Sequence, residues 1–157
     1  TPATTGSPSS TSSASTSPSG SGTSALAALK PCDLLTSDEV GRLGLVDPGE
    51  ADRVAGAETC LWTAADSGNA SAAILPGKGF GDLDYTGDHA VPTTIGEYRA
   101  TRVEAPLDAK YICHVVISVS ESSSVQVIAT IKPTSTDTPA ACERATRTAE
   151  LIAPKLP

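Results

Sequence analysis

The sequence predicts an α+β fold: an antiparallel sheet of about five strands, an N-terminal and a C-terminal helix packed on one face, and two disulfides. Three observations support this prediction. A helix-start motif comes first, short segments of alternating apolar residues follow it, and an apolar stripe at helical spacing ends the chain. Helices before and after a run of strands are typical of a sheet that is covered on one side.

The chain divides into two parts by composition. Residues 1–24 contain only Thr, Ser, Pro, Gly and Ala, without charge or any large apolar side chain, and therefore have nothing to bury in a core. We expect residues 1–24 to be a disordered Ser/Thr/Pro-rich tether, and residues 25–157 to form a single α+β domain of ordinary size. The alternative for residues 1–24 is a terminus without a role.

The first helix is predicted from a capping box. The Thr36 hydroxyl can accept from the Glu39 amide while the Glu39 carboxylate reaches back to the Thr36 amide. Gly41 weakens the middle of this helix, Gly44 ends it, and Asp47-Pro48-Gly49 signals a turn. The helix is therefore expected to be short.

Strand patterns occupy the middle of the chain. Residues 58–65 and 70–75 are expected to form a hairpin, residues 76–87 an irregular Gly- and Asp-rich loop, and residues 94–104 a further strand. The strongest signal is residues 111–120, followed by an antiparallel partner after a short polar turn. One face of this pair is apolar: Val115, Ile117 and Val119 on the first strand, and Val125, Val127, Ala129 and Ile131 on the second.

The last helix is predicted to open at Thr138 as N-cap with Pro139 in the first turn. Its apolar residues recur at intervals of three and four, so that one stripe should face the sheet. The stripe consists of Cys142, Ala145, Ala149 and Ile152, whereas Glu143, Arg144, Arg147 and Glu150 are expected to face water.

Four cysteines are spread along the chain at Cys32, Cys60, Cys113 and Cys142. An even number without the close-set pairs of a zinc site indicates two disulfides, and hence an oxidising compartment outside the cytoplasm. Of the three possible pairings we favour Cys32–Cys60 and Cys113–Cys142, because each joins a helical segment to a strand. Loops of nearly 30 residues would give each bond a stabilising effect of about 3 to 4 kcal/mol.

Charge and hydropathy exclude several classes of partner. The net charge is −7 and the basic residues are scattered, which disfavours nucleic acid and anionic lipid as electrostatic partners. No apolar run long enough to span a bilayer occurs, and no signal peptide is present, so an export signal would have been cleaved or left out.

Few residues suggest chemistry. The start of a calcium-binding loop is resembled by the motif Asp82-x-Asp84-x-Thr86-Gly87-Asp88. The carboxylate that closes such a loop is missing, which favours a solvated acidic turn. Calcium binding is left open as the alternative. Gly77-Lys78-Gly79 lacks the spacing of a phosphate loop. His89 and His114 have no defined nucleophile motif near them, and His114 should lie on the opposite sheet face from Cys113, partly exposed. Trp62 is expected in the core. We therefore predict no catalytic, metal or cofactor residues.

The chain resembles a family of actinobacterial cell-envelope lipoproteins whose domain is of unknown function. The resemblance rests on four motifs across residues 30–153: Pro31-Cys32-Asp33-Leu34-Leu35-Thr36 with Glu39-Val40, Cys60-Leu61-Trp62, Cys113 before alternating apolar residues, and Cys142 with Ala145 and Ala149. It implies a lipid anchor on a cysteine that precedes the tether and is absent from this chain.

These observations favour a non-catalytic cell-envelope lipoprotein domain, a ligand- or protein-binding module at the outer face of the membrane. The alternative is a hydrolase that processes envelope polymers. The expected partner is an envelope protein or a small ligand of unknown identity. We expect a monomer held at the membrane only through the lipid anchor.

Overall fold

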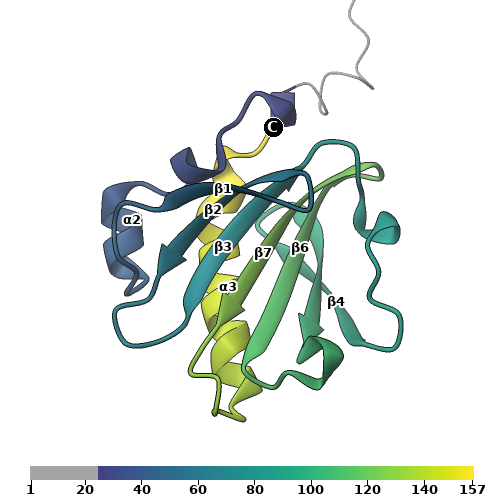
Figure 1. Ribbon diagram of the computed structural model, residues 1–157. Helices are drawn as coiled ribbons and strands as arrows, with labels where there is room; N and C mark the ends of the chain where they lie inside the picture. Colours follow the sequence, from purple (N-terminus) through teal and green to yellow (C-terminus); the bar gives the residue numbers. More distant parts are fainter. Residues whose placement is uncertain (1–24) are drawn as a thin grey trace, which may run out of the picture.

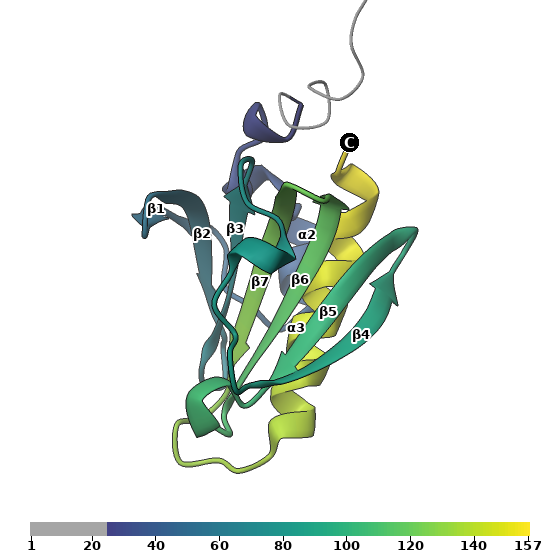
Figure 2. The same ribbon diagram turned by 90° about the vertical axis from the view of Figure 1, so that its right-hand side faces the viewer.

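A computed structural model describes residues 25–157, and the predicted tether, residues 1–24, lies outside the described residues. The chain forms one seven-stranded antiparallel sheet in the order β1-β2-β3-β7-β6-β5-β4, with the long helix α3 across one face (Figures 1 and 2). The strands are β1 (Glu50–Val54), β2 (Ala57–Thr63), β3 (Asn69–Leu75), β4 (His89–Ile95), β5 (Tyr98–Glu104), β6 (Ile112–Ser120) and β7 (Ser123–Thr130). The helices are α2 (Ser37–Arg42) and α3 (Thr138–Ile152), with 3-10 turns η1 (Pro31–Asp33), η2 (Phe80–Asp82), η3 (Pro106–Asp108) and η4 (Ala153–Lys155).

The sheet has seven strands, so the prediction of about five is wrong in number. β1 was missed because all five of its residues are exposed, which removes the apolar alternation that marks a strand. The expected single strand over residues 94–104 is two strands, because the chain reverses at Gly96, where φ is +60°, and β4 pairs back on β5.

The N-terminal helix is also corrected. The capping box forms as predicted, with the Thr36 amide donating to Glu39 at 2.9 Å and the Glu39 amide donating to the Thr36 hydroxyl at 3.2 Å. The helix is nevertheless only six residues long, and within residues 25–157 only α3 spans a sheet face as a long helix. The preceding turn η1 packs against β1, β2 and β3 instead.

The core lies between the sheet and α3. β6 and β7 pair antiparallel, and the predicted apolar face turns inward, where Val115, Ile117, Val125 and Val127 are fully buried. Trp62 from β2 joins this core with 1% of its surface exposed. The stripe of α3 is also buried as predicted: Cys142, Ala145, Ala149 and Ile152.

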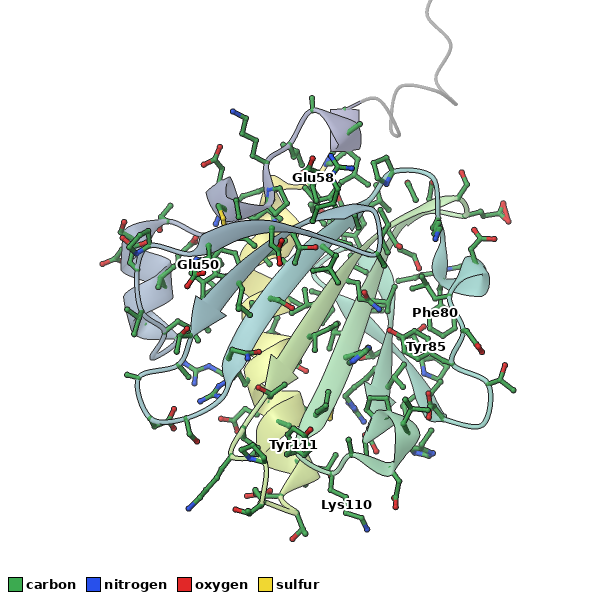
Figure 3. All side chains as sticks on the ribbon, viewed as in Figure 1. Glu50, Glu58, Phe80, Tyr85, Lys110 and Tyr111 are labelled. Carbon is green, nitrogen blue, oxygen red and sulfur yellow. A yellow bond between two sulfur atoms is a disulfide. The ribbon has the colours of Figure 1, made fainter. Side chains whose placement is uncertain are left out.

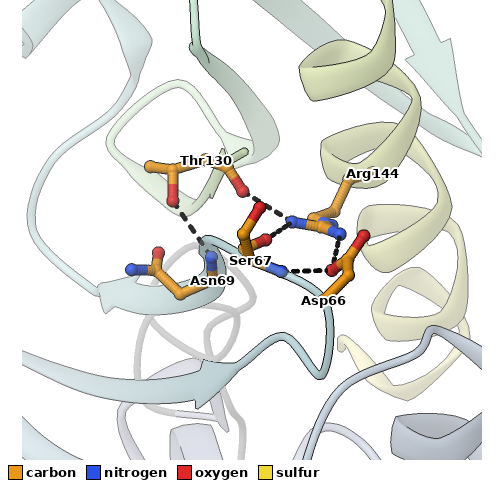
Figure 4. Close-up of polar contacts among 5 residues, drawn as sticks. All are labelled: Asp66, Ser67, Asn69, Thr130 and Arg144. Atoms are coloured by element: carbon orange, nitrogen blue, oxygen red, sulfur yellow. Dashed lines mark hydrogen bonds and ion pairs between the residues drawn. The ribbon is translucent and has the colours of Figure 1, made fainter. Parts of the chain in front are cut away.

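Two details of α3 differ from the prediction. The N-cap is Asp137 rather than Thr138, since its carboxylate accepts from the Ala140 amide at 3.2 Å. Arg144 does not face water: its side chain is 14% exposed and its guanidinium donates to the Thr130 and Ser67 carbonyls at 2.7 and 2.8 Å (Figure 4). An ion pair with Asp66 at 3.0 Å completes this contact between α3 and the β2–β3 turn.

The two disulfides fasten the layers. Cys32 in η1 is bonded to Cys60 in β2, and Cys113 in β6 is bonded to Cys142 in α3. This is the pairing that we favoured among the three, and each bond joins a helical segment to a strand. The described residues contain no free cysteine.

The two sheet edges differ. β4 carries Pro92 at its centre, and a proline cannot donate to a ladder, which is why it is tolerated on an edge strand. β1, at the other edge, carries charged side chains in place of a proline. None of the helices within residues 25–157 is long and apolar enough to cross a membrane.

Candidate functional site

The sheet face opposite α3, here called the open face, carries the candidate site. Figure 1 views the sheet with α3 behind it, so the open face is toward the reader. Because neighbouring strands are in register, side chains that point to this face form rows across the sheet. One row runs Asp52, Thr59, Ala73 and Gln126, from the β1 edge to the centre of the sheet.

These rows form the floor of an apolar groove with a volume of about 240 Å³. Strands β1, β2, β3 and β7 supply most of the lining, and Lys78 and Leu83 come from the segment after β3. Leu61, Leu75, Leu83 and Ile128 are only half-buried, and Val54 at the rim is 52% exposed. The lining consists of Asp52, Val54, Ala55, Ala57, Thr59, Leu61, Ser71, Ala73, Leu75, Lys78, Leu83, Gln126 and Ile128.

Two polar groups on the groove floor are already engaged within the protein. The Thr59 hydroxyl donates to the Ala57 carbonyl at 3.0 Å. The Gln126 amide nitrogen donates to the Tyr85 hydroxyl at 2.5 Å. The Thr59 hydroxyl hydrogen and one of the two Gln126 amide hydrogens are therefore engaged without a ligand, and the floor presents mainly apolar surface.

A second cavity, of about 350 Å³, lies beside the groove at the β1–β2 turn. The two share Ala55, Ala57, Leu75 and Lys78 as lining residues. Together they fall within the range of about 300 to 1,000 Å³ that is typical of small-molecule sites. Lys78 thus lies at the boundary between the groove and its neighbour.

One wall of the groove belongs to residues 76–88, here called the flap, which crosses the open face beside β6. Tyr85 from the flap lies at 2.6 Å from Nδ1 of His114 on β6, and the two rings meet edge to face. Phe80 stacks on Tyr85, and Figure 3 shows both rings together at the flap. Val116 of β6 also points to the open face and is fully buried.

The hydrogen bonds of Tyr85 and the burial of the pair together favour a neutral His114. Gln126 donates to the Tyr85 oxygen, so the Tyr85 hydroxyl hydrogen is available to donate to Nδ1 of His114 in the tautomer that leaves this nitrogen unprotonated. Burial favours the same state: it lowers the pKa of His114 to about 4 and raises the pKa of Tyr85 to about 12. Both groups are neutral at physiological pH, and His114 is half-buried on the sheet face opposite Cys113, as predicted.

The base of the flap is held by the turn between β6 and β7. The Lys78 carbonyl accepts from the Ser124 hydroxyl at 2.7 Å. Gly79 follows, at a point where an added Cβ would lie 1.9 Å from the Glu121 carbonyl oxygen. Only glycine allows this approach of the two backbones, so Gly79 fixes where the flap passes the β6–β7 turn.

The acidic motif in the flap uses its carboxylates for backbone contacts. Asp82 and Asp84 accept from backbone amides inside the flap, at 2.9 and 3.2 Å, and Asp88 accepts from the Leu107 amide at 2.9 Å. Within residues 25–157 no three His, Cys, Asp or Glu side chains converge as metal ligands would. The three carboxylates of this motif are thus used in contacts within the protein.

The two histidines are not brought together. His89 lies on the edge strand β4 with an exposed side chain, 3.6 Å from Glu104, whereas His114 lies beneath the flap. A different cavity, of about 600 Å³, lies beside α3, but it is lined mostly by charged and hydroxyl side chains and its Arg102 and Glu104 pair with each other at 2.8 Å. The apolar groove is therefore the better candidate for a ligand site.

The fold and the groove define the chain as a disulfide-linked antiparallel sheet domain with one covering helix and an apolar open face. A family model described as "Protein of unknown function (DUF3558)" matches residues 1–155, and the chain belongs to this family. No curated protein and no solved structure matches the chain. The expected membership of a family of unknown function is thus confirmed, and the actinobacterial lipoprotein origin stays a prediction.

Proposed function

We propose that residues 25–157 form a non-catalytic binding module that works outside the cytoplasm, and that its ligand site is the apolar groove on the open face. The observation that carries the proposal is the groove itself, because four strands and the flap keep aliphatic side chains in contact with water at one concave place. Exposed apolar surface costs free energy, and a ligand that covers it recovers that free energy.

The two disulfides support the extracytoplasmic part of the proposal. Disulfides persist in oxidising compartments and are rare in the cytosol. Trapping thiols by alkylation in intact cells of the source organism is expected to leave all four cysteines unmodified. Modification of the cysteines in the folded protein would place the domain in a reducing compartment instead.

The tether is proposed from composition alone. A chain that begins at Ala25 is expected to keep the same free energy of unfolding as the full chain, within about 0.5 kcal/mol, because residues 1–24 carry no large apolar side chain to bury. Urea unfolding of both chains measures the difference. A chain from Ala25 that fails to fold would show that residues 1–24 belong to the domain.

The groove is tested with an uncharged aliphatic probe. Octanol added to the full chain is expected to cause saturable NMR shifts of the methyl groups of Leu61, Ala73 and Ile128. Ala73→Phe fills the groove and should abolish these shifts, whereas Ala90→Phe, on the exposed edge strand β4, should leave them unchanged.

A second variant keeps the test decisive in case Ala73→Phe does not fold. Val54→Lys changes a half-exposed residue at the rim, so the fold should tolerate it while octanol binding weakens. Octanol shifts that spread over the whole surface, or that persist in Ala73→Phe, would contradict a ligand site in the groove.

A further inference from the structure

The lining of the groove indicates the shape of its ligand. None of the described residues that line it is aromatic; Leu61, Leu75, Leu83 and Ile128 supply branched aliphatic surface around the small Ala73. Flat aromatic ligands are usually held by stacking on aromatic rings, which this groove does not offer. Branched aliphatic walls around a small residue instead suit a flexible hydrocarbon chain.

The polar groups on the groove floor also favour a hydrocarbon chain as the ligand. A sugar or a peptide brings many donors and acceptors that must find partners when buried. The Thr59 hydroxyl hydrogen and one of the two Gln126 amide hydrogens already donate, to Ala57 and Tyr85, so the floor offers few free donors to such a ligand. A hydrocarbon chain has no donors or acceptors that need partners when it is buried.

The charged side chains beside the groove differ in whether another residue already pairs with them. Arg53, in the adjoining cavity, pairs with Glu58 and donates to the Gly56 carbonyl, so its charge is compensated. Asp52 accepts from the Arg53 amide at 2.7 Å. No ion pair within residues 25–157 includes Lys78, which is exposed where the two cavities meet and offers three donors.

We propose that the groove binds a free amphiphile with a single aliphatic chain and an anionic head, a carboxylate or a phosphate. The chain lies against Leu61, Ala73 and Ile128, and the head is bound by the ammonium group of Lys78. The proposal rests on the proposed function of the groove and adds the chemical class of the ligand. A single chain matches the volume of about 240 Å³, which is small for a two-chain lipid.

The test compares three probes that share one chain: octanoate, octanol and octyltrimethylammonium, each titrated into the full protein and followed by the same methyl shifts. Octanoate is expected to bind about two- to fivefold more tightly than octanol, the range of a solvent-exposed charge contact. The cationic probe is expected to bind more weakly than octanol. Lys78→Gln should remove the preference for octanoate without affecting octanol.

The matched control is Lys110→Gln, which changes the net charge by the same amount at the far end of the domain (Figure 3). It should leave the preference for octanoate intact. Equal binding of octanoate and octyltrimethylammonium, or an unchanged preference in Lys78→Gln, would overturn the anionic head while leaving the groove as a site. No binding of any probe would overturn the proposed function as well. Binding to anionic vesicles without binding of free octanoate would replace the free amphiphile by a membrane surface.

Discussion

His114 is a half-buried neutral base whose environment makes stability depend on pH. Burial lowers its pKa to about 4, whereas the unfolded chain binds the proton near the ordinary value of 6.5. Between these values the unfolded state carries more protons than the folded state, so stability falls as the pH falls from 6.5 to 4. We expect a loss of about 2 to 3 kcal/mol from this residue between pH 7 and pH 4.

His114→Gln isolates that effect, because a glutamine cannot take up the proton. Urea unfolding at several pH values should give a shallower pH dependence for the variant than for the wild type over this window. The nearby charge of Asp88 opposes the shift by raising the pKa of His114, and it is present in both proteins. Identical pH profiles would mean that His114 is accessible to protons in the folded state.

Lys155 joins the C-terminal segment to the start of the domain. Its ammonium donates to the Leu34 carbonyl at 2.7 Å and pairs with Glu39. Burial alone would raise the pKa of Glu39, but the hydrogen bonds from Lys155 and the Thr36 amide outweigh it and lower that pKa. The stability due to this ionised carboxylate is therefore present above the ordinary value of 4.5 and is lost as the pH falls through the lowered pKa.

Lys155→Met is expected to destabilise the domain by about 1 to 2 kcal/mol at pH 7, because it leaves the Leu34 carbonyl and Glu39 without their donor. The difference from wild type should shrink as the pH falls from 4.5 through the lowered pKa of Glu39, for example between pH 7 and an acidic pH at which the wild type is still folded. Thermal unfolding at the two pH values measures both. An equal loss at both pH values would assign the effect to packing of the lysine stem rather than to the ion pair.

The burial or capping role of a single residue was predictable where the residues near it in the sequence determine that role. The burial of Cys60 and Trp62 follows from alternation along β2, and the Thr36–Glu39 capping box is local. The contact between Tyr85 and His114 was not predictable, since it joins residues 29 positions apart through a loop without periodicity. Nor was η3, where Ala105, Leu107 and Asp108 adopt positive φ without a glycine to signal it.

Arg144 contributes at the level of whole elements, because one side chain connects α3, the β2–β3 turn and the end of β7 (Figure 4). Arg144→Met is expected to destabilise the domain by about 1.5 to 3 kcal/mol, since it leaves the Ser67 and Thr130 carbonyls without donors. Urea unfolding measures the change. Arg147→Met, on the exposed side of the same helix, is the control and should stay within about 0.5 kcal/mol of the wild type.

Helices and strands were predictable where the burial of one face makes apolar residues recur at regular intervals. The β6–β7 hairpin and α3 each bury one face, so apolar residues recur at two or at three and four positions. β1 buries neither face, and β4 is an edge strand with few buried residues, so neither leaves a pattern. Arg144 was assigned to the solvent side because its partners come from segments 14 and 77 residues away.

At the scale of the molecule, the disulfide Cys113–Cys142 connects α3 to the centre of the sheet. α3 is rich in alanine and buries little surface per residue, so its attachment should depend on this bond. Replacing both cysteines by alanine is expected to cost about 3 to 4 kcal/mol, the chain-entropy value for a separation of 29 residues. Amide hydrogen exchange should show α3 losing protection before the β6–β7 hairpin does.

The Cys32–Cys60 pair provides the comparison, with a sequence separation of 28 and thus nearly the same entropic effect. Its replacement by alanine should release residues around η1 while α3 stays protected. Loss of α3 protection in both variants alike would mean that the domain unfolds as a single unit and that α3 has no special dependence on its disulfide.

The groove itself was beyond prediction from single segments, because its lining comes from four strands and the flap. A partial signal existed in β3, where Ala72-Ala73-Ile74-Leu75 is apolar at consecutive positions and so indicates burial on both faces. The strand order was needed to place Leu61, Ala73 and Ile128 side by side. That order depends on non-local pairing, which a turn or a helix cap does not specify.

The second cavity lies at the end of the domain where the described chain begins. Ala27 and Leu29, at the beginning of the described chain, line this cavity together with Lys78. In both ribbon views this end also carries the C-terminus, and the loops around Lys110 and Tyr111 lie at the opposite end (Figures 1 to 3). An anchor attached ahead of residues 1–24 would therefore join the domain at the end that carries Lys78, so that an amphiphile leaving the membrane would meet this end of the domain before the loops around Lys110 and Tyr111.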